Sequence, residues 1–312
     1  MTISAQTFDE HRRYLWGICY RMTGSAADAE DIVQDAFVRA LEKPPADMEA
    51  PLRPWLVKIA INLSRDQLRR RRRREYFGPW LPAPVITEDD TPLDLHDQPA
   101  AGSSPMAQYD LTESLTIAFL VALEALTPTQ RAVLLLRDVF DYSTTETAGA
   151  VAITESNVKV TLHRARRIMR AYDKDRLPCT LRSVDKIRET LQRFLARLAA
   201  GDVDALKAML ADDVVLVSDG GGEVNALAEP MLGATKVLRL LTKLYEAKRD
   251  VTNTSLRIVN CEPAILITRS RVNPGHASFF TMHGELNATG QVRRLNFVFS
   301  PSKLSALRSQ TA

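Results

Sequence analysis

The spacing of hydrophobic residues changes twice along the chain. Between residues 8 and 74, apolar side chains recur every three or four positions, the period of a helix that is buried along one face. Ser25 stands before the second of these segments with Asp28 three positions later, which is the spacing of a helix N-cap. The pattern predicts three helices, whose inner faces carry Phe8, Leu15, Ile18, Cys19 and Met22, then Ile32, Val33, Ala36, Phe37, Ala40 and Leu41, then Trp55, Leu56, Ile59, Ala60 and Leu63.

The helical period is lost between residues 77 and 110. This segment contains six prolines, and residues 85–114 include seven acidic side chains and no lysine or arginine. A segment of this composition cannot bury a core of its own. We therefore expect an extended acidic linker at 77–110.

Helical spacing returns between residues 111 and 178. Two helix starts are marked by capping boxes, at Thr127–Gln130 with a proline in the first helical position and at Ser143–Glu146. A third and basic helix follows near Thr154. Two short helices and a basic third helix after a tight connection are typical of a helix-turn-helix.

The last part of the chain, residues 181–312, mixes two kinds of pattern. Helical spacing at about Val184–Ala199 and Gly233–Lys248 accompanies several stretches in which apolar and polar residues alternate. The pattern predicts an α+β domain with an antiparallel sheet. The chain is thus expected to be a multi-domain protein, with helical domains at 1–76 and 111–178, the linker between them, and the α+β domain at 181–312.

Composition limits the classes of function. The hydrophobic content of 45% and the charged content of 25% are typical of globular proteins, and a formal net charge of +3 does not make the whole chain a nucleic-acid binder. Three distant cysteines without CxxC spacing indicate reduced thiols and no metal site. No apolar run could span a bilayer and no signal-peptide pattern is present, so a cytoplasmic protein without membrane attachment is expected.

Positive charge is concentrated on the third predicted helix. Residues 53–74 contain nine basic side chains and one acid, a local net charge of +8, and end in six consecutive arginines. Polar positions at i, i+4, i+7 and i+11 share the face opposite the apolar stripe; they are Lys58, Asn62, Arg65 and Arg69. A basic face on an anchored helix favours binding to phosphates, with a merely solvated basic face as the alternative.

The second predicted helix carries charge of the opposite sign. Asp28, Asp31 and Asp35 recur at i, i+3 and i+7, with Gln34 beside them. The preference of acids for a helix N-terminus explains Asp28 but not the other two. Because an acidic stripe repels DNA, its partner is expected to be a basic protein surface.

The basic helix of the predicted helix-turn-helix has two distinct sides. Its apolar positions, Val158, Leu162, Ala165 and Met169, are expected to face inward. Residues near its N-terminus are expected at base edges and the later arginines at phosphates. The outward residues are Asn157, Lys159, Thr161, Arg164 and Arg167. An amphipathic helical hairpin without affinity for DNA is the alternative.

Taken together, these motifs resemble a known family. SAADAEDIVQDAFVRAL, PWLVKIAINLSRDQLRRRRR and LTPTQRAVLLLRDVFDYSTTETA are similar to regions 2 and 4 of the extracytoplasmic-function (ECF) sigma factors, the subunits that give bacterial RNA polymerase its promoter specificity. The remainder resembles a SnoaL-like domain of the nuclear-transport-factor-2-like fold, as in the sigma-factor subgroup where this domain replaces a separate anti-sigma protein. The resemblance implies two all-α domains, regions 2 and 4, and a SnoaL-like α+β cone or barrel.

The resemblance also implies partners and roles. Core RNA polymerase, through its β′ clamp helices and β subunit, and promoter DNA would be the partners. Region 2 would face the −10 element, where a base must leave the stack, with Asn62 as the expected base contact. The implied −10 residues are Lys58, Asn62, Arg65, Arg69 and Arg70, the −35 residues are Asn157, Lys159, Thr161, Arg164 and Arg167, and the polymerase-binding residues are Asp28, Asp31, Gln34 and Asp35.

Three further motifs resemble the family with departures. WLPAP at Trp80–Pro84 resembles a Trp-Leu-Pro-Glu-Pro linker motif that docks on the C-terminal domain, with Ala83 in place of glutamate. DGGGEV at Asp219–Val224 resembles Asp-Gly-Gly-Gly-Lys, with Glu223 in place of lysine, and SPSKL at Ser300–Leu304 loosely echoes Asn-Pro-Asp-Lys-Leu. The resemblance implies regulation in cis through contacts of Trp80, Leu81, Pro82, Asp219, Gly220, Gly221 and Gly222. The alternative is that Trp80 packs on the end of the arginine-rich helix.

A fourth departure lies in the turn of the helix-turn-helix. This turn usually carries a glycine that takes a positive φ, whereas the chain has Ala152 there and Gly149 one turn earlier. If the turn geometry is kept, alanine costs about 1 kcal/mol. A shifted turn and a weakened region 4 are both left open.

Relatives of the SnoaL-like fold include enzymes that use a cavity Asp or Asp/His pair. The candidates here are Asp213, Asp219, Glu223, His276 and His283. On one continuous strand the two histidines would face opposite sides, and no Gly-Lys-Ser/Thr follows the glycines as in a phosphate loop. We expect no enzyme, cofactor or metal site, and a small ligand in the C-terminal domain is left open. The alternative function is a SnoaL-type enzyme or ligand sensor fused to a DNA-binding module that acts without polymerase, a reading that leaves the acidic stripe unexplained.

Overall fold

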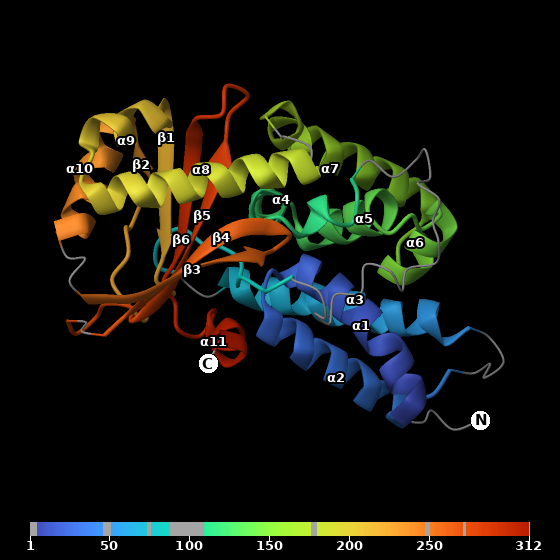
Figure 1. The fold of residues 1–312 in the computed structure, drawn as a ribbon. Helices are drawn as coiled ribbons and strands as arrows, with labels where there is room; N and C mark the ends of the chain where they lie inside the picture. Colours follow the sequence, from blue (N-terminus) through green and yellow to red (C-terminus); the bar gives the residue numbers. More distant parts are fainter. Residues whose placement is uncertain are drawn as a thin grey trace. The chain divides into compact units, whose positions relative to one another are not determined.

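The computed structural model of the 312-residue chain describes residues 5–45, 51–73, 76–87, 109–175, 180–246, 250–270 and 273–311. They form two compact units (Figure 1). The N-terminal unit is helical, and the C-terminal unit joins the segment 76–87 to the residues from 175 onward. Most of the acids expected in the linker, from Glu88 to Asp97, lie outside the described residues. Within the described residues, none of the helices combines the length and apolar character that a membrane span requires.

The first three helices are α1 (Ala5–Thr23), α2 (Ala26–Glu42) and α3 (Leu52–Arg73), which pack on one another. The predicted N-cap of α2 depends on neighbouring residues and is confirmed. Gly24 follows α1 with a φ of 65°, and the Ser25 side chain accepts a hydrogen bond from the Asp28 amide.

The predicted inner faces of these helices need a correction. Leu41 was placed in the apolar stripe of α2, but it is 59% exposed. It follows the buried Ala40 by 100° of helical rotation and falls outside the buried arc. Trp55 and Ile59 are only half-buried, because they line a surface pocket described below.

The second half of the N-terminal unit contains η1 (Glu113–Leu115), α4 (Ile117–Ala122), η2 (Leu123–Ala125), α5 (Pro128–Asp138), α6 (Thr144–Val151) and α7 (Glu155–Asp175). Both predicted capping boxes are present with reciprocal hydrogen bonds, Thr127 with Gln130 and Ser143 with Glu146. Helices α6 and α7 are joined by a short turn, which confirms the helix-turn-helix.

The structure decides which way Ala152 departs from the usual turn. Ala152 adopts φ 59° and ψ 51°, so the turn geometry is kept and alanine occupies a left-handed conformation. An L-residue with a Cβ is strained there by about 1 kcal/mol. The strained residue lies in the turn between α6 and α7, which sets the direction of α7.

Replacing Ala152 with glycine is expected to stabilise the N-terminal unit by about 1 kcal/mol, because glycine takes this conformation without strain. Urea unfolding followed by the helical signal measures the change. The matched control is Ala148→Gly in the interior of α6, which should destabilise by a similar amount since glycine disfavours a helix. A loss of stability in both variants would show that the turn is unstrained.

The C-terminal unit is built on a six-stranded sheet in the order β2-β1-β6-β5-β4-β3. The strands are β1 (Leu210–Asp219), β2 (Met231–Leu232), β3 (Val251–Val259), β4 (Glu262–Arg269), β5 (Phe279–Leu286) and β6 (Val292–Val298). The prediction of a wholly antiparallel sheet is wrong, because β1 pairs with β6 in parallel. Strands β3 to β6 form successive antiparallel pairs, and β1 lies on the remaining edge of β6 across a long connection that the alternation pattern does not encode.

Helices cover the sheet of the C-terminal unit and close its core. They are α8 (Leu181–Ala200), α9 (Val203–Met209) and α10 (Ala234–Glu246), while α11 (Ser305–Thr311) follows the last strand. Figure 1 shows α8 lying across the sheet, where it packs on β4 and β5. A Cβ at Gly284 would lie 2.9 Å from Leu191 Cδ2, so glycine permits this close approach. The predicted α+β character of this domain is confirmed.

Candidate nucleic-acid interface and linker contact

The outer surface of α2 carries the predicted acidic residues. Asp31, Gln34 and Asp35 are exposed and lie on one side of the helix, here called the acidic face. Asp28 differs from them because it is half-buried and accepts a hydrogen bond of 2.8 Å from Gln67 Nε2 of α3. Three of the four predicted residues are therefore presented together, and the fourth ties α2 to α3.

Two apolar residues continue the acidic face toward the end of α2. Val38 is 52% exposed and Leu41 is 59% exposed. They follow Asp31 and Asp35 at helical spacing, and this spacing is the signal in the sequence by which they could have been found. The surface as a whole combines acids with an exposed apolar end.

The predicted basic face of α3 divides into exposed and engaged residues. Lys58, Arg69 and Arg70 are exposed, and Arg69 also pairs with the exposed Asp66 of the same helix at 2.8 Å. Arg65 is half-buried, and its guanidinium donates to the Val151 carbonyl at the end of α6 at 2.8 Å and to the Asn62 side-chain oxygen at 3.2 Å. A cation suits the carbonyl end of a helix. Arg65 thus joins α3 to α6 and orients Asn62.

The next arginines of the run hold the helical unit together. Arg71 makes two hydrogen bonds to the Glu124 carboxylate, at 2.6 and 2.7 Å, and the buried Arg131 donates to the same group at 2.7 Å. Arg72 donates to the Leu126 carbonyl. Burial alone would raise the pKa of Glu124, but the charges of Arg131 and Arg71 outweigh it and hold the pKa below its ordinary value. Glu124 is a partner that sequence analysis missed, since no local pattern links it to a run more than 50 residues away.

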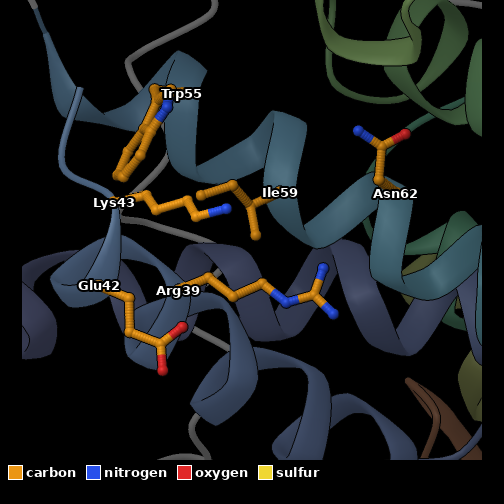
Figure 2. Close-up of a pocket in the computed structure, with 6 residues that line it drawn as sticks. All are labelled: Arg39, Glu42, Lys43, Trp55, Ile59 and Asn62. Atoms are coloured by element: carbon orange, nitrogen blue, oxygen red, sulfur yellow. The ribbon is translucent and has the colours of Figure 1, made fainter. Parts of the chain in front are cut away.

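A pocket opens between α2 and α3 (Figure 2). Its volume is about 430 Å³. It combines an aromatic ring, two cations and an amide, which are the groups that bind an unstacked base and its phosphates. The lining residues are Arg39, Glu42, Lys43, Trp55, Ile59 and Asn62. In Figure 2, Trp55 and Lys43 lie together at one end and Asn62 lies at the other.

Helix α7 presents its predicted outer residues. Asn157, Lys159, Arg164 and Arg167 are exposed, and Thr161 is half-buried. The inward residues Val158, Ala165 and Met169 are buried as predicted, whereas Leu162 is half-buried. Arg166 fixes α7 on α5 by two hydrogen bonds, of 2.6 and 2.9 Å, to the buried Asp138 carboxylate. The helix is therefore held rigidly with its polar face outward.

In the C-terminal unit, the Asp219 carboxylate is a buried centre of four hydrogen bonds. One oxygen accepts from the Tyr76 hydroxyl at 2.5 Å and from the Gly221 amide at 2.9 Å. The other accepts from the Leu81 amide at 2.7 Å and from Lys303 Nζ at 2.6 Å. A buried charge is tolerated when it is paired and hydrogen-bonded in this way. Asp219 joins the linker, the glycine turn and the segment after β6.

Lys303, in the segment after β6, contacts both Asp219 and the linker. Its ammonium donates to the Leu81 carbonyl at 2.7 Å and lies 4.6 Å from the centre of the Trp80 ring, a cation–π distance. Leu81 and Pro82 are buried. Trp80 thus contacts a side chain of the C-terminal unit, and its neighbour Leu81 is held by both members of an ion pair.

The following linker residues add to the edge of the sheet. Ile86 forms an antiparallel bridge with Val259 at the end of β3. The Val85 amide donates to the Asn260 side-chain oxygen at 3.0 Å, and the Thr87 amide donates to the Ile258 carbonyl at 3.0 Å. A β-bridge is made by backbone hydrogen bonds, which explains why the side-chain pattern did not reveal the contact.

Comparison with known proteins gives the family. The model of sigma-70 region 2 matches residues 7–74, and that of sigma-70 region 4 matches residues 116–169. The ECF RNA polymerase sigma factor SigJ of Mycobacterium tuberculosis H37Rv is 32% identical over 244 residues, which are 77% of this chain and 72% of SigJ. The chain belongs to the ECF sigma factors. The crystal structure of M. tuberculosis SigJ matches 97% of the chain and 99% of its own, with a TM-score of 0.71 and 26% identity.

A second relative extends the similarity over nearly the whole chain. The probable ECF sigma factor SigI of M. tuberculosis is 26% identical over 307 residues, which are 96% of this chain and 94% of SigI. The region 2 match spans α1 to α3, and the region 4 match spans α4 to most of α7. This sigma factor therefore carries the parts that bind core RNA polymerase and promoter DNA.

The departures in the linker motifs of this sigma factor have local explanations. Ala83 is buried, so a glutamate there would need a partner of its own. Glu223 accepts hydrogen bonds from the hydroxyls of Ser300 and Ser302 at 2.5 and 2.7 Å. Burial alone would raise the pKa of Glu223, but these hydrogen bonds and the charge of Lys303 outweigh it and lower the pKa.

The glycine turn of the sigma factor requires glycine at two positions. A Cβ at Gly220 would lie 2.2 Å from the Val224 carbonyl oxygen, and one at Gly221 would lie 2.5 Å from Ser300 Oγ. Gly221 also has a φ of 65°. Gly222 has a φ of 74° but open space around it. The turn thus folds back tightly on the segment that carries Ser300 and Lys303.

The five candidate catalytic residues do not converge. Asp213 and His276 are exposed, while Asp219 and Glu223 are engaged in the contacts above. His276 precedes β5, so the premise that both histidines share a strand is wrong. His283 is buried on the sheet face opposite to Gly284, and burial lowers its pKa to about 4. Among the described residues, no group of three or more His, Cys, Asp or Glu side chains could hold a metal.

Proposed function

We propose that this sigma factor binds core polymerase through the acidic face of α2, reads the −10 element with α3 and its pocket, and reads the −35 element with α7. We also propose that the contact between the linker and the C-terminal unit regulates these regions in cis. The observation that carries the proposal is that one helical unit has two surfaces of opposite charge. Acids are exposed on α2, and cations are exposed on α3. Such a protein acts where core polymerase is found, in the cytoplasm.

The −10 assignment is supported by the pocket between α2 and α3. A base that leaves the stack needs an aromatic or planar surface and hydrogen-bonding groups for its edge. Trp55 supplies the ring, and the Asn62 amide supplies a donor and an acceptor. Arg39 and Lys43 line the same pocket and can neutralise the adjoining phosphates.

The contacts of the individual arginines refine their proposed roles. Lys58, Arg69 and Arg70 are exposed and are proposed to bind DNA phosphates. Arg65 donates to Asn62 and to the end of α6, so we assign it to positioning the base-reading amide. Arg71 and Arg72 contact Glu124 and Leu126, so we assign them to the stability of the helical unit.

Replacing Asn62 with alanine is expected to relax discrimination at one position of the −10 element by roughly 5- to 100-fold, since a lost base-edge contact is worth about 1–3 kcal/mol. Transcription from promoters carrying each base at each −10 position measures the effect. The control is Lys58→Ala, which should weaken all promoters alike because a phosphate contact carries no sequence information. If Asn62→Ala also weakens all promoters equally, Asn62 does not read a base.

Regulation in cis is supported by the density of contacts around Asp219. Tyr76, just before the linker, and the linker residues Leu81 and Ile86 each bond to the rest of the C-terminal unit, by hydrogen bonds to Asp219 or by a bridge to β3. The linker connects regions 2 and 4 in sequence, so its attachment limits how far the two regions can separate. We therefore assign the C-terminal unit a regulatory role without catalysis, which agrees with the dispersed positions of its acids and histidines.

A further inference from the structure

The outer face of α7 contains an exposed apolar side chain among polar ones. Val160 is 47% exposed. It lies at i+3 from Asn157 and at i−4 from Arg164, so the three side chains share one stripe of the helix. Thr161 stands next to this stripe and is half-buried. Val160 therefore lies in the middle of the surface proposed to enter the −35 element.

Its position along the helix places Val160 within reach of bases. Helix α7 begins at Glu155, and the Thr154 hydroxyl caps it by accepting from the Asn157 amide. Val160 is thus in the second turn, and the N-terminal residues of a recognition helix are those that contact base edges. Side chains later in the helix, including Arg167, are placed for phosphates.

The major groove offers one apolar group, the C5-methyl of thymine. Direct readout of an A·T pair combines hydrogen bonds to adenine with an apolar contact to this methyl. Valine has no hydrogen-bonding group and only one flexible side-chain torsion, so it binds an apolar partner with little loss of entropy. A hydrogen bond from a polar side chain would not distinguish thymine from uracil, which differs from thymine only in lacking the methyl.

We propose that Val160 determines −35 specificity by contacting the C5-methyl group of a thymine. The proposal rests on the assignment of α7 to the −35 element. Asn157 and Arg164, one turn to either side, take hydrogen bonds with the neighbouring bases or phosphates. The neighbouring helical turns fix the position of Val160, and the ion pair of Arg166 with Asp138 fixes the helix.

The test removes the C5-methyl group of a thymine from the DNA and, in a separate variant, the valine side chain of residue 160 from the protein. Holoenzyme made from the 312-residue chain and core polymerase is bound to a promoter that it transcribes. Each −35 thymine on either strand is replaced in turn by deoxyuridine, which lacks only the C5-methyl. One replacement is expected to lower the affinity of the wild-type holoenzyme roughly three- to fivefold, the effect of burying one methyl-sized group. Val160→Ala should bind the two DNAs equally, and as weakly as the wild type binds the deoxyuridine promoter.

Ile168→Ala provides the matched control. Ile168 is another exposed apolar residue of α7, 37% exposed, but it lies two turns nearer the C-terminus. This variant should keep the wild-type preference for thymine. Equal sensitivity to deoxyuridine in wild type and Val160→Ala would overturn the proposal, as would weaker binding of Val160→Ala to core polymerase without DNA, which would make Val160 a protein contact.

The proposed role of α7 itself is tested in the same assay by Arg164→Ala and Arg167→Ala. If these variants weaken binding to the −35 element while no thymine is sensitive, α7 binds DNA and the role of Val160 is wrong. If neither variant changes −35 binding, the assignment of α7 fails and the proposal falls with it.

Discussion

Reversing charge at Asp31 and Asp35, by changing both to lysine, is expected to lower the affinity of this sigma factor for core RNA polymerase on the order of 100-fold. The two side chains are exposed on the acidic face and belong to one stripe of α2. Like charges brought together at an interface cost several kcal/mol, whereas an exposed lysine on a helix costs the fold little. Binding to labelled core polymerase and the helical circular dichroism of the free protein measure the two quantities.

The control for this experiment carries the same change in net charge elsewhere. Asp212 and Asp213 are exposed at the start of β1 in the C-terminal unit. Changing both to lysine should leave core binding within about twofold, because neither residue belongs to the acidic face proposed to bind core polymerase. If both double variants lost the same affinity for core polymerase, the loss would come from the change in net charge. The acidic face would then not be the binding surface.

Replacing Asp219 with alanine is expected to release the linker from the C-terminal unit and to change promoter activity several-fold. The substitution leaves Lys303 with a buried charge and the Leu81 amide without its acceptor. Breaking a buried ion pair in this way typically costs about 3–5 kcal/mol. Hydrogen exchange should show faster exchange of the Leu81 amide, and transcription with core polymerase measures the activity.

Two further variants separate this contact from general destabilisation. Asp213→Ala removes an exposed carboxylate from the same strand and should change neither exchange nor activity. Trp80→Ala removes the ring under Lys303, and its effect should be smaller in the Asp219→Ala background than in the wild type, since residues of one network are not additive. Protection of the Leu81 amide that survives Asp219→Ala would show that the linker is held by β3 and not by this centre.

The parts of the fold that could be predicted are those determined by neighbouring residues. The N-cap of α2 at Ser25 and the capping boxes at Thr127 and Ser143 depend on residues three positions apart, and all three are present. The parallel pairing of β1 with β6 could not be predicted, because strands so far apart in sequence leave no mark on each other's alternation pattern. The prediction that Leu41 is buried is also wrong, because the predicted apolar stripe extends one residue beyond the buried Ala40.

In the candidate sites, too, features set by neighbouring residues could be predicted, and features set by distant residues could not. Exposure of Asp31 and Asp35 follows from helical period alone, and so does the outward face of α7. The arginine run is uniform in sequence, yet Arg69 is exposed and pairs within its own helix, with Asp66, while Arg71 is half-buried and pairs with Glu124. The difference comes from a partner in another helix. Lys303 and Asp219 are likewise 84 residues apart, and only the returning chain after β6 brings them together.

Transcription by purified core polymerase tests the central claim most directly. The 312-residue chain is mixed with core polymerase and a library of promoter fragments, and the 5′ ends of the transcripts are mapped. We expect transcripts that start at a fixed distance from a shared pair of −35 and −10 sequences, and we expect them to disappear when Asp31 and Asp35 are changed to lysine. Binding of the chain to specific DNA without any start site that depends on it would contradict the account, and would favour a DNA-binding protein that works without polymerase.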